Sequence, residues 1–248
     1  MDKLVKHLRK VLLQNPAIQI KKSNIWHLPI HTYEVQFKRV RRSKMDILMK
    51  MMLLTLEEAD IRRPANLSEL LLVEELFIAD LLKKMLRIGL IRLEKEIYKL
   101  TSIGRSQLET GIFAEEMEEE STILSYSPFH LEFWPEMSET IPENSEDHPL
   151  FRYANNKELE NAEQILQFLA EKENGEEEDG FQIVVEEVTS FSLQNVEYIP
   201  CFEFQLYNQE QDTYYARVWN LWLNRWDETL EQQIEEKERI NWRNRGSQ

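Results

Sequence analysis

LRIGLIRLEKEIYKLTSIGRSQLETG, residues 86–111, is the stretch that decides the predicted fold. Gly89 follows an apolar run with helical spacing and is placed to end a helix in the left-handed conformation that glycine adopts without strain. Two short apolar-rich runs on either side of Lys95 and Glu96 predict a small β-hairpin. Thr101 then predicts the N-cap of a further helix that continues to about Glu120.

Upstream of this stretch, the sequence predicts two helices separated by a tight turn. Asn66, with Glu69 three residues later, is a favourable N-cap for a short helix that ends near Leu72. A second helix is expected from about Glu75 to Arg87, because its apolar residues recur at helical spacing.

A strand and a helix are predicted before these two helices. Residues 33–40 alternate between apolar and polar side chains, which indicates a half-buried strand. Ser43 and Asp46 form a capping-box-like start for a helix that is apolar nearly all round and must therefore be buried on more than one side. Its methionines are expected in the core, with an adaptable partner groove as the alternative: Met45, Met49, Met51 and Met52.

The order of these elements resembles the winged helix-turn-helix superfamily over about residues 43–113. The similarity is greatest to bacterial regulators whose wing ends in a Leu-Thr-x-x-Gly-Arg-x-x-Leu pattern, here Leu100, Thr101, Gly104, Arg105 and Leu108. Together with the strand and helix pattern of the acidic half, this similarity predicts an α+β protein with an N-terminal winged helix-turn-helix domain followed by a small antiparallel-sheet α+β domain with a long C-terminal helix. The resemblance itself covers only the first of these domains. It also implies that the second helix of the motif enters the major groove of DNA.

The charge of this 248-residue chain is divided unevenly. The formal net charge is −15, but residues 1–113 have a net charge of +8 and residues 114–248 a net charge of −23. Such asymmetry suggests nucleic-acid contact or an acidic tail. The hydrophobic fraction of 42% excludes wholesale disorder, and the single cysteine, Cys201, excludes an internal disulfide framework.

Nucleic-acid contact is expected to be non-specific. Residues 75–80, at the start of the second helix, include two carboxylates and none of the donors that usually contact base edges. Basic residues elsewhere are placed for phosphate contact, which is weak and strongly salt-dependent. The predicted set is Lys38, Arg39, Arg41, Arg42, Lys44, Lys83, Lys84, Arg87, Lys95, Lys99 and Arg105. Alternatively, these residues form a solvated face, or a docking surface for an acidic partner or for the acidic half of the chain.

The acidic half is predicted to form a small sheet with helices packed on it. The predicted strands are Thr122–Tyr126, Phe129–Trp134, Phe181–Val188, Cys201–Tyr207 and Thr213–Val218, and Asn155 caps a helix between the second and third. A long helix is expected over residues 218–242, with Trp219, Trp222 and Trp226 on one face, in the core or at a protein interface. The predicted division of the chain is 1–32, an N-terminal helix and connector, 33–120, the winged-helix domain, and 121–248, the acidic domain.

No catalytic or metal site is predicted. His27 and His31 have a spacing that suits metal ligands on a helix, but Pro29 makes a helix there unfavourable. The weak nuclease-like pattern of Asp179, Glu203 and Gln205 lacks the lysine that normally assists the attacking water.

The sequence therefore favours a cytoplasmic, non-enzymatic accessory subunit of a nucleic-acid-associated complex. It would contact double-stranded DNA weakly through the basic half and bind a protein partner through the acidic half, with no cofactor, no metal and no membrane contact. The basic amphipathic N-terminal helix is expected to dock on the protein's own body. The alternatives are a sequence-specific transcriptional regulator and a Mg²⁺-dependent nuclease. Homo-oligomerisation is left open.

Overall fold

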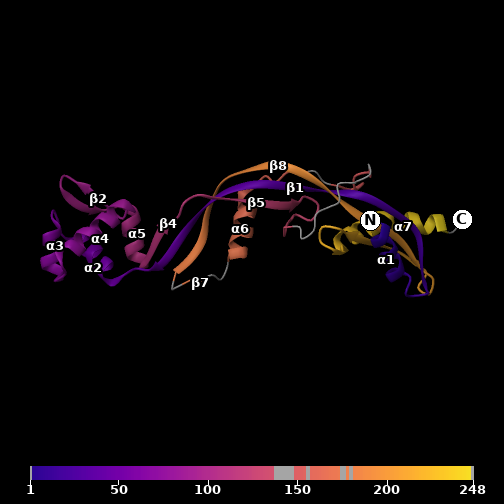
Figure 1. Cartoon of the computed structure of the whole chain (residues 1–248), viewed down its shortest axis with the longest axis horizontal. Coiled ribbons are helices and arrows are strands. Elements are labelled where there is room, and N and C mark those ends of the chain that lie inside the picture. Colours follow the sequence, from indigo (N-terminus) through magenta and orange to yellow (C-terminus); the bar gives the residue numbers. More distant parts are fainter. Residues whose placement is uncertain (1, 137–147, 155–156, 174–176, 179–180, 247–248) are drawn as a thin grey trace. The chain divides into compact units, whose positions relative to one another are not determined.

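The computed structural model describes residues 2–136, 148–154, 157–173, 177–178 and 181–246 (Figure 1). Two very long strands dominate it, β1 (Ile18–Lys44) and β8 (Phe181–Asn208). They lie side by side in a sheet of order β10-β9-β8-β1-β5-β6, in which β4 also pairs with β1 and β7 with β8. The remaining strands of this sheet are β4 (Ile112–Glu116), β5 (Glu120–Ser127), β6 (Glu132–Trp134), β7 (Glu177–Glu178), β9 (Thr213–Asn220) and β10 (Arg225–Trp226).

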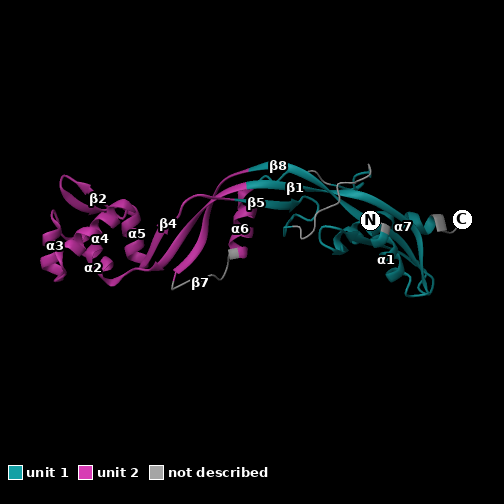
Figure 2. Cartoon of the chain, in the orientation of Figure 1, with its two compact units in different colours: residues 1–34, 122–160, 192–248 teal, residues 35–121, 161–191 magenta. Residues whose placement is uncertain are grey.

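The chain forms two compact units, each assembled from segments that are distant in sequence (Figure 2). Unit 1 consists of residues 1–34, 122–160 and 192–248. Unit 2 consists of residues 35–121 and 161–191. Both β1 and β8 therefore contribute residues to each unit.

In unit 1, residues that alternate along β8 enter two different cores. Cys201 is buried in a cluster with Leu230 and Ile234 of α7 (Glu228–Gly246). Phe202 is buried in a second cluster with residues of α1 (Asp2–Leu12). The apolar side of α1 packs there, as predicted, through Leu4, Val5, Leu8 and Leu12.

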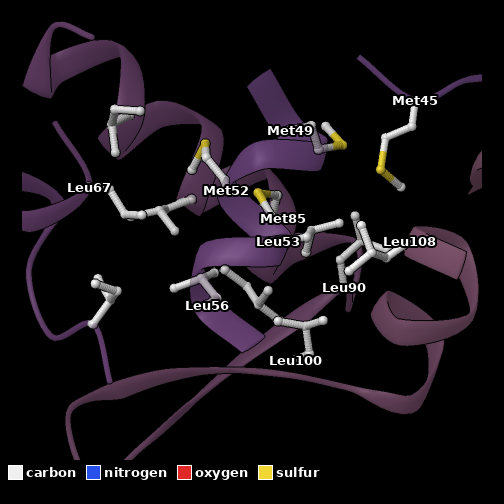
Figure 3. Close-up of a cluster of buried hydrophobic side chains, with 14 of the residues drawn as sticks. Met45, Met49, Met52, Leu53, Leu56, Leu67, Met85, Leu90, Leu100 and Leu108 are labelled. Atoms are coloured by element: carbon white, nitrogen blue, oxygen red, sulfur yellow. The ribbon is translucent and has the colours of Figure 1, made fainter. Parts of the chain in front are cut away.

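The helices of unit 2 surround one continuous apolar cluster (Figure 3). They are α2 (Ile47–Glu58), α3 (Pro64–Leu71), α4 (Glu75–Arg87) and α5 (Ser102–Thr110), with a hairpin of β2 (Ile91–Glu94) and β3 (Ile97–Leu100) between α4 and α5. The buried members of this cluster all come from residues 45–113. Met45, Met49 and Met52 are among them, which confirms the core interpretation for these three methionines. The interpretation is wrong for Met51, which is 46% exposed. The remaining helix of unit 2 is α6 (Ala162–Glu173).

Several local predictions for unit 2 are confirmed. The bounds of α4 and of the hairpin agree with the sequence pattern, and Gly89 has the expected positive φ of 73°. Thr101 caps α5 by accepting a hydrogen bond from the Gly104 N–H at 3.1 Å. A Cβ on Gly104 would lie only 2.0 Å from the carbonyl oxygen of Leu90, so only glycine fits there.

Three helix boundaries differ from the predictions. Asp46, not Ser43, caps α2, because its carboxylate accepts hydrogen bonds from the backbone N–H groups of the first turn. Helix α3 begins at Pro64 rather than after Asn66, since proline is well suited to the first helical position. Helix α5 ends before Gly111 rather than at about Glu120, because Gly111 adopts a left-handed φ of 67°.

The predicted fold class is wrong. The prediction was an N-terminal winged helix-turn-helix domain followed by a separate sheet domain. It requires the strand over residues 33–40 to belong to a local, self-contained domain. That stretch is instead the middle of β1, which lies between β8 and β5 in one large antiparallel sheet. The protein is thus an α+β structure dominated by a sheet to which both halves of the chain contribute.

The predicted elements of the acidic half are also partly wrong. The strands expected at Phe181–Val188 and Cys201–Tyr207 are parts of the single strand β8. The polar residues between them stay in the strand, where Ser190 Oγ donates to Gln36 Oε1 at 2.8 Å on the neighbouring β1. The final helix begins at Glu228, ten residues later than expected. The predicted cap Asn155 lies outside the described residues.

Candidate partner-binding surface

The turn between α3 and α4 is a compact, hydrogen-bonded corner. The backbone N–H of Leu72 donates to the Ser68 carbonyl, and the Ser68 hydroxyl donates to the Val73 carbonyl at 2.7 Å. Leu67 and Ile78 on either side of the turn are fully buried and fix both helices to the core of unit 2. The corner is therefore held rigidly by its own backbone and by the core below it.

Large apolar side chains project from this rigid corner into solvent. Four of them lie within eight residues, and they are 55% to 91% exposed: Leu70, Leu72, Leu76 and Phe77. Single exposed apolar residues are normal, but a local group of this kind marks an interaction surface on many proteins. We call these four residues the apolar corner.

Leu72 is the most exposed member and has an unusual backbone. Its φ and ψ of 55° and 40° place it in the left-handed region, where glycine or asparagine is normally found at a helix end. A leucine in this conformation costs roughly 1 kcal/mol relative to an unstrained residue. Neither burial nor backbone preference explains a leucine at this position.

The apolar corner lies in an acidic stretch. Glu69, Glu74, Glu75 and Asp80 are exposed beside it, and residues 64–82 contain no lysine or arginine. The Asp80 carboxylate is paired at 3.1 Å with Lys83, one turn further along α4. Glu74 and Glu75 stand at the N-terminus of α4, where the helix dipole favours negative charge.

Two of the three basic residues predicted on α4 contact other groups of unit 2. Lys83 pairs with Asp80, and the Lys84 ammonium lies 5.2 Å from the centre of the Phe113 ring. Arg87 lines a pocket of about 650 Å³ that it shares with Glu115, Glu116 and Glu186.

The predicted basic cluster on β1 packs against acidic strands of the same unit. Lys38 lies 4.0 Å from Glu187, and Arg39 lies 3.3 Å from Glu120. Arg41 stacks at 3.7 Å over the Phe181 ring and is the register partner of Glu115 on β4, while Arg42 and Lys44 continue the same pairing with β4. Lys38 and Arg39 thus contact carboxylates of the acidic half of the chain, whereas Arg41, Arg42 and Lys44 are exposed.

Of the predicted basic residues in and after the hairpin, two lie beside carboxylates and one lies at the hairpin tip. Lys99 is hydrogen-bonded to Asp60, and Arg105 lies 3.4 Å from Glu57. Lys95 is exposed at the tip of the hairpin, where its φ of 48° forms the turn. The structure therefore distributes the predicted nucleic-acid set over several elements and pairs much of it with carboxylates.

The three predicted tryptophans do not share a helix face. Trp219 is in β9, Trp226 is its partner in β10, and Trp222 lies in the turn between these strands. Asn220 builds that turn, because its side-chain oxygen accepts hydrogen bonds from the N–H groups of Trp222 and Leu223. Trp222 is buried and donates its indole N–H to the Pro135 carbonyl at 3.0 Å, so it packs in the core of unit 1.

Of the residues considered for metal and nuclease chemistry, His27, His31 and Glu203 are buried, and Gln205 is half-buried. His27 and His31 are buried on β1, and burial lowers the pKa of His31. Burial raises the pKa of the Cys201 thiol. Among the residues that the structure describes, no group of three or more His, Cys, Asp or Glu side chains is arranged to hold a metal ion. Asp179, part of the nuclease-like pattern, lies outside the described residues.

Sequence reasoning missed an ion pair in unit 1 between the buried Glu203 and Arg152, whose side chain is 34% exposed. Arg152 donates to both oxygens of the buried Glu203 carboxylate, at 2.7 and 3.0 Å, and pairs with Glu238 of α7. Trp26 also donates to Glu203 at 2.6 Å. Burial alone would lower the pKa of the Arg152 guanidinium, but Glu203 and Glu238 outweigh this effect and raise it. Arg152, Glu203 and Glu238 line a pocket of about 550 Å³, together with Trp242.

A second missed cluster joins Ser127, His130 and Asp227. The Nδ1 of His130 lies 2.8 Å from Ser127 Oγ, and its Nε2 lies 3.1 Å from Asp227 Oδ1. The order of groups resembles a nucleophile–base–acid series, but Ser127 is fully buried and no substrate can reach it. The cluster joins the turn after β5 to the start of α7. His130 and Asp227 are 97 positions apart, so no local sequence pattern predicts their contact.

Comparison with protein-family models, with curated proteins and with solved structures found no match to this chain. No helix within the described ranges is both long and apolar enough to cross a membrane.

Proposed function

We propose that this protein is a non-enzymatic adaptor that binds another protein through the apolar corner of unit 2. The observation behind this proposal is the exposure of Leu70, Leu72, Leu76 and Phe77 on a rigid turn. Apolar side chains on a preorganised turn bind with less loss of conformational entropy than those on a flexible loop, because the backbone is already fixed before binding. The accessory role expected from the sequence is kept, but partner binding moves from the acidic half to α3 and α4.

Contact with double-stranded DNA stays a prediction for the basic residues. Its support is weaker, because carboxylates and aromatic rings of unit 2 already contact several of them. A sequence-specific regulator has no support from the start of α4, where carboxylates and apolar side chains are exposed. A nuclease centred on Glu203 is disfavoured by the pairing of this carboxylate with Arg152.

Site-specific photo-crosslinking tests the adaptor proposal. A photoreactive phenylalanine analogue replaces Leu76 in the full chain, and the same analogue replaces Leu131 as a control. Leu131 is a matched control, since it is 66% exposed and belongs to unit 1. We expect discrete protein adducts from position 76 in the native cells and none of the same mass from position 131.

The identified protein is then purified, and its affinity for the wild-type chain and for Leu76→Ser is measured. Loss of a central apolar contact should weaken binding by about tenfold or more. Identical adducts from both positions, or adducts from position 76 that disappear on nuclease treatment, would contradict the proposal.

A further inference from the structure

The charges around the apolar corner restrict what can cover it. Glu69, Glu74 and Glu75 are exposed among its apolar side chains, and residues 64–82 contribute no positive charge of their own. An anionic ligand such as a nucleic-acid backbone or an acidic membrane surface would be repelled by these carboxylates. A second copy that docks by the same corner would bring like charges together and be disfavoured for the same reason.

The backbone of Leu72 is a further feature of the apolar corner. The residue combines a left-handed backbone with 91% exposure, so a glycine would fold at least as well at this position. Strained residues that the fold does not need are concentrated at functional sites. Leu131 of unit 1 also combines a positive φ, 57°, with 66% exposure, so this backbone feature points to an occupant only where further exposed apolar side chains surround it, as they do at Leu72.

We infer that the apolar corner binds a cationic amphipathic segment of a partner protein. Apolar side chains of that segment contact Leu72, Leu76 and Phe77, while its lysine or arginine side chains pair with Glu69, Glu74 and Glu75. Helices that present apolar residues at helical spacing bind apolar surfaces in this way. The inference rests on the proposed function and adds the chemical class of the partner to it.

The test uses the full chain and three labelled helical peptides in fluorescence anisotropy. One peptide contains leucine and lysine with leucines at helical spacing, the second has glutamate in place of each lysine, and the third is a scrambled version of the first. We expect the patterned lysine peptide to bind, and both others to bind at least about tenfold more weakly, since both the charge and the apolar face are recognised.

Variants of the chain assign this binding to the apolar corner. Phe77→Ser should weaken it about tenfold. Glu74→Lys combined with Glu75→Lys should weaken it by a similar factor of about ten at low salt and by less at high salt, because salt screens exposed charges. Leu72→Gly should weaken it about threefold or more while the melting temperature stays equal or rises, which separates lost binding from lost folding.

Two matched changes in unit 1 serve as controls for binding by net charge alone. Leu131→Ser and Glu210→Lys alter exposed residues far along the chain and should change the affinity by less than about twofold. Equal effects of these controls, or equal binding of the glutamate peptide, would overturn the inference. If that happens while position 76 still crosslinks a protein, the adaptor proposal stands and only the partner's class is wrong. Absence of both results would overturn both.

Discussion

At the scale of single residues, Arg152 is the charged partner of the Glu203 carboxylate in unit 1. Its partner Glu203 is buried, and removal of the guanidinium leaves that carboxylate with the Trp26 N–H as its remaining donor among the bonds described above. We expect Arg152→Ala to lower the free energy of unfolding by about 1–3 kcal/mol, because the buried Glu203 carboxylate loses a charged hydrogen-bond partner while Trp26 still donates to it. Urea denaturation monitored by tryptophan fluorescence measures this change.

The double variant Arg152→Ala/Glu203→Gln provides the control. Because Glu203→Gln removes the buried charge, the double variant should lose at least about 1 kcal/mol less than the sum of the single variants. If the loss of unfolding free energy in the double variant equals the sum of the losses in the single variants, the two side chains act independently. That result would refute the ion pair as the cause of the destabilisation.

Glu231 makes unit 1 sensitive to pH near neutrality. Burial raises the pKa of its carboxyl to about 7, although the carboxylate accepts a hydrogen bond from the Val218 N–H. Its folded-state pKa thus lies above the unfolded value of 4.5, so its contribution to stability is full below pH 4.5 and is lost as the pH rises through about 7.

Glu231→Gln should therefore unfold like the wild type near pH 4.5 and be more stable at pH 8, by on the order of 3 kcal/mol. Urea denaturation at the two pH values measures this difference. Glu236→Gln, an exposed change of equal charge on α7, should keep the pH slope of the wild type. A wild-type slope in Glu231→Gln would rule out Glu231 as its source.

At the scale of elements, the sequence predicted correctly those boundaries that are set by residues close together in the chain. The bounds of α4 were predictable because Gly89 and the apolar spacing around it act within a few residues. Strand β1 was not, since Pro29 and the polar residues near it suggest an interruption, whereas distant backbone partners hold the strand together. Trp219, Trp222 and Trp226 are spaced by three and four residues, which predicted a helix, but a turn at Asn220 separates two strands there instead.

The start of α7 gives an element-scale prediction. Asp227 accepts a hydrogen bond from the Leu230 N–H at the first turn of α7 and contacts His130 and the fully buried Asn220. Asp227→Ala should lower the free energy of unfolding by about 2–4 kcal/mol, because it removes a cap and leaves buried polar groups unpaired. Hydrogen exchange should locate the loss in the first turn of α7. Glu228→Ala, an exposed change next to it, should cost less than about 0.5 kcal/mol.

The pH dependence of this cap has the opposite sign to that of Glu231. Burial alone would raise the pKa of Asp227, but its hydrogen bonds with His130, Asn220 and the Leu230 N–H outweigh burial and lower the pKa. The group therefore stabilises the fold above its unfolded pKa, and that contribution is lost as the pH falls through the lowered value. The acid limb of the stability profile should be shallower in Asp227→Ala, and an unchanged limb would contradict this assignment.

At the scale of the whole molecule, the division of charge along the sequence is not a division between structural units. Residues 1–113 have a net charge of +8 and residues 114–248 a net charge of −23. Basic residues of β1 pair with carboxylates of β5 and β8, so part of this charge is neutralised inside unit 2. Each unit also takes residues from both halves of the chain. A cut at residue 120, which the sequence suggested as a domain boundary, therefore separates segments that fold together.

Fragments made at that boundary test this organisation. Residues 121–248 contain β5, β8 and α7 but lack β1, whose Trp26, Leu28 and Ile30 are buried in the α7 cluster. We expect this fragment to show no cooperative unfolding by circular dichroism, because its central strand is missing. Residues 45–113 contain every buried member of the unit 2 cluster, so that fragment should unfold cooperatively. Co-expression of 1–120 with 121–248 should restore cooperative unfolding of the longer fragment. A 121–248 fragment that unfolds cooperatively alone would contradict a core of unit 1 that depends on β1.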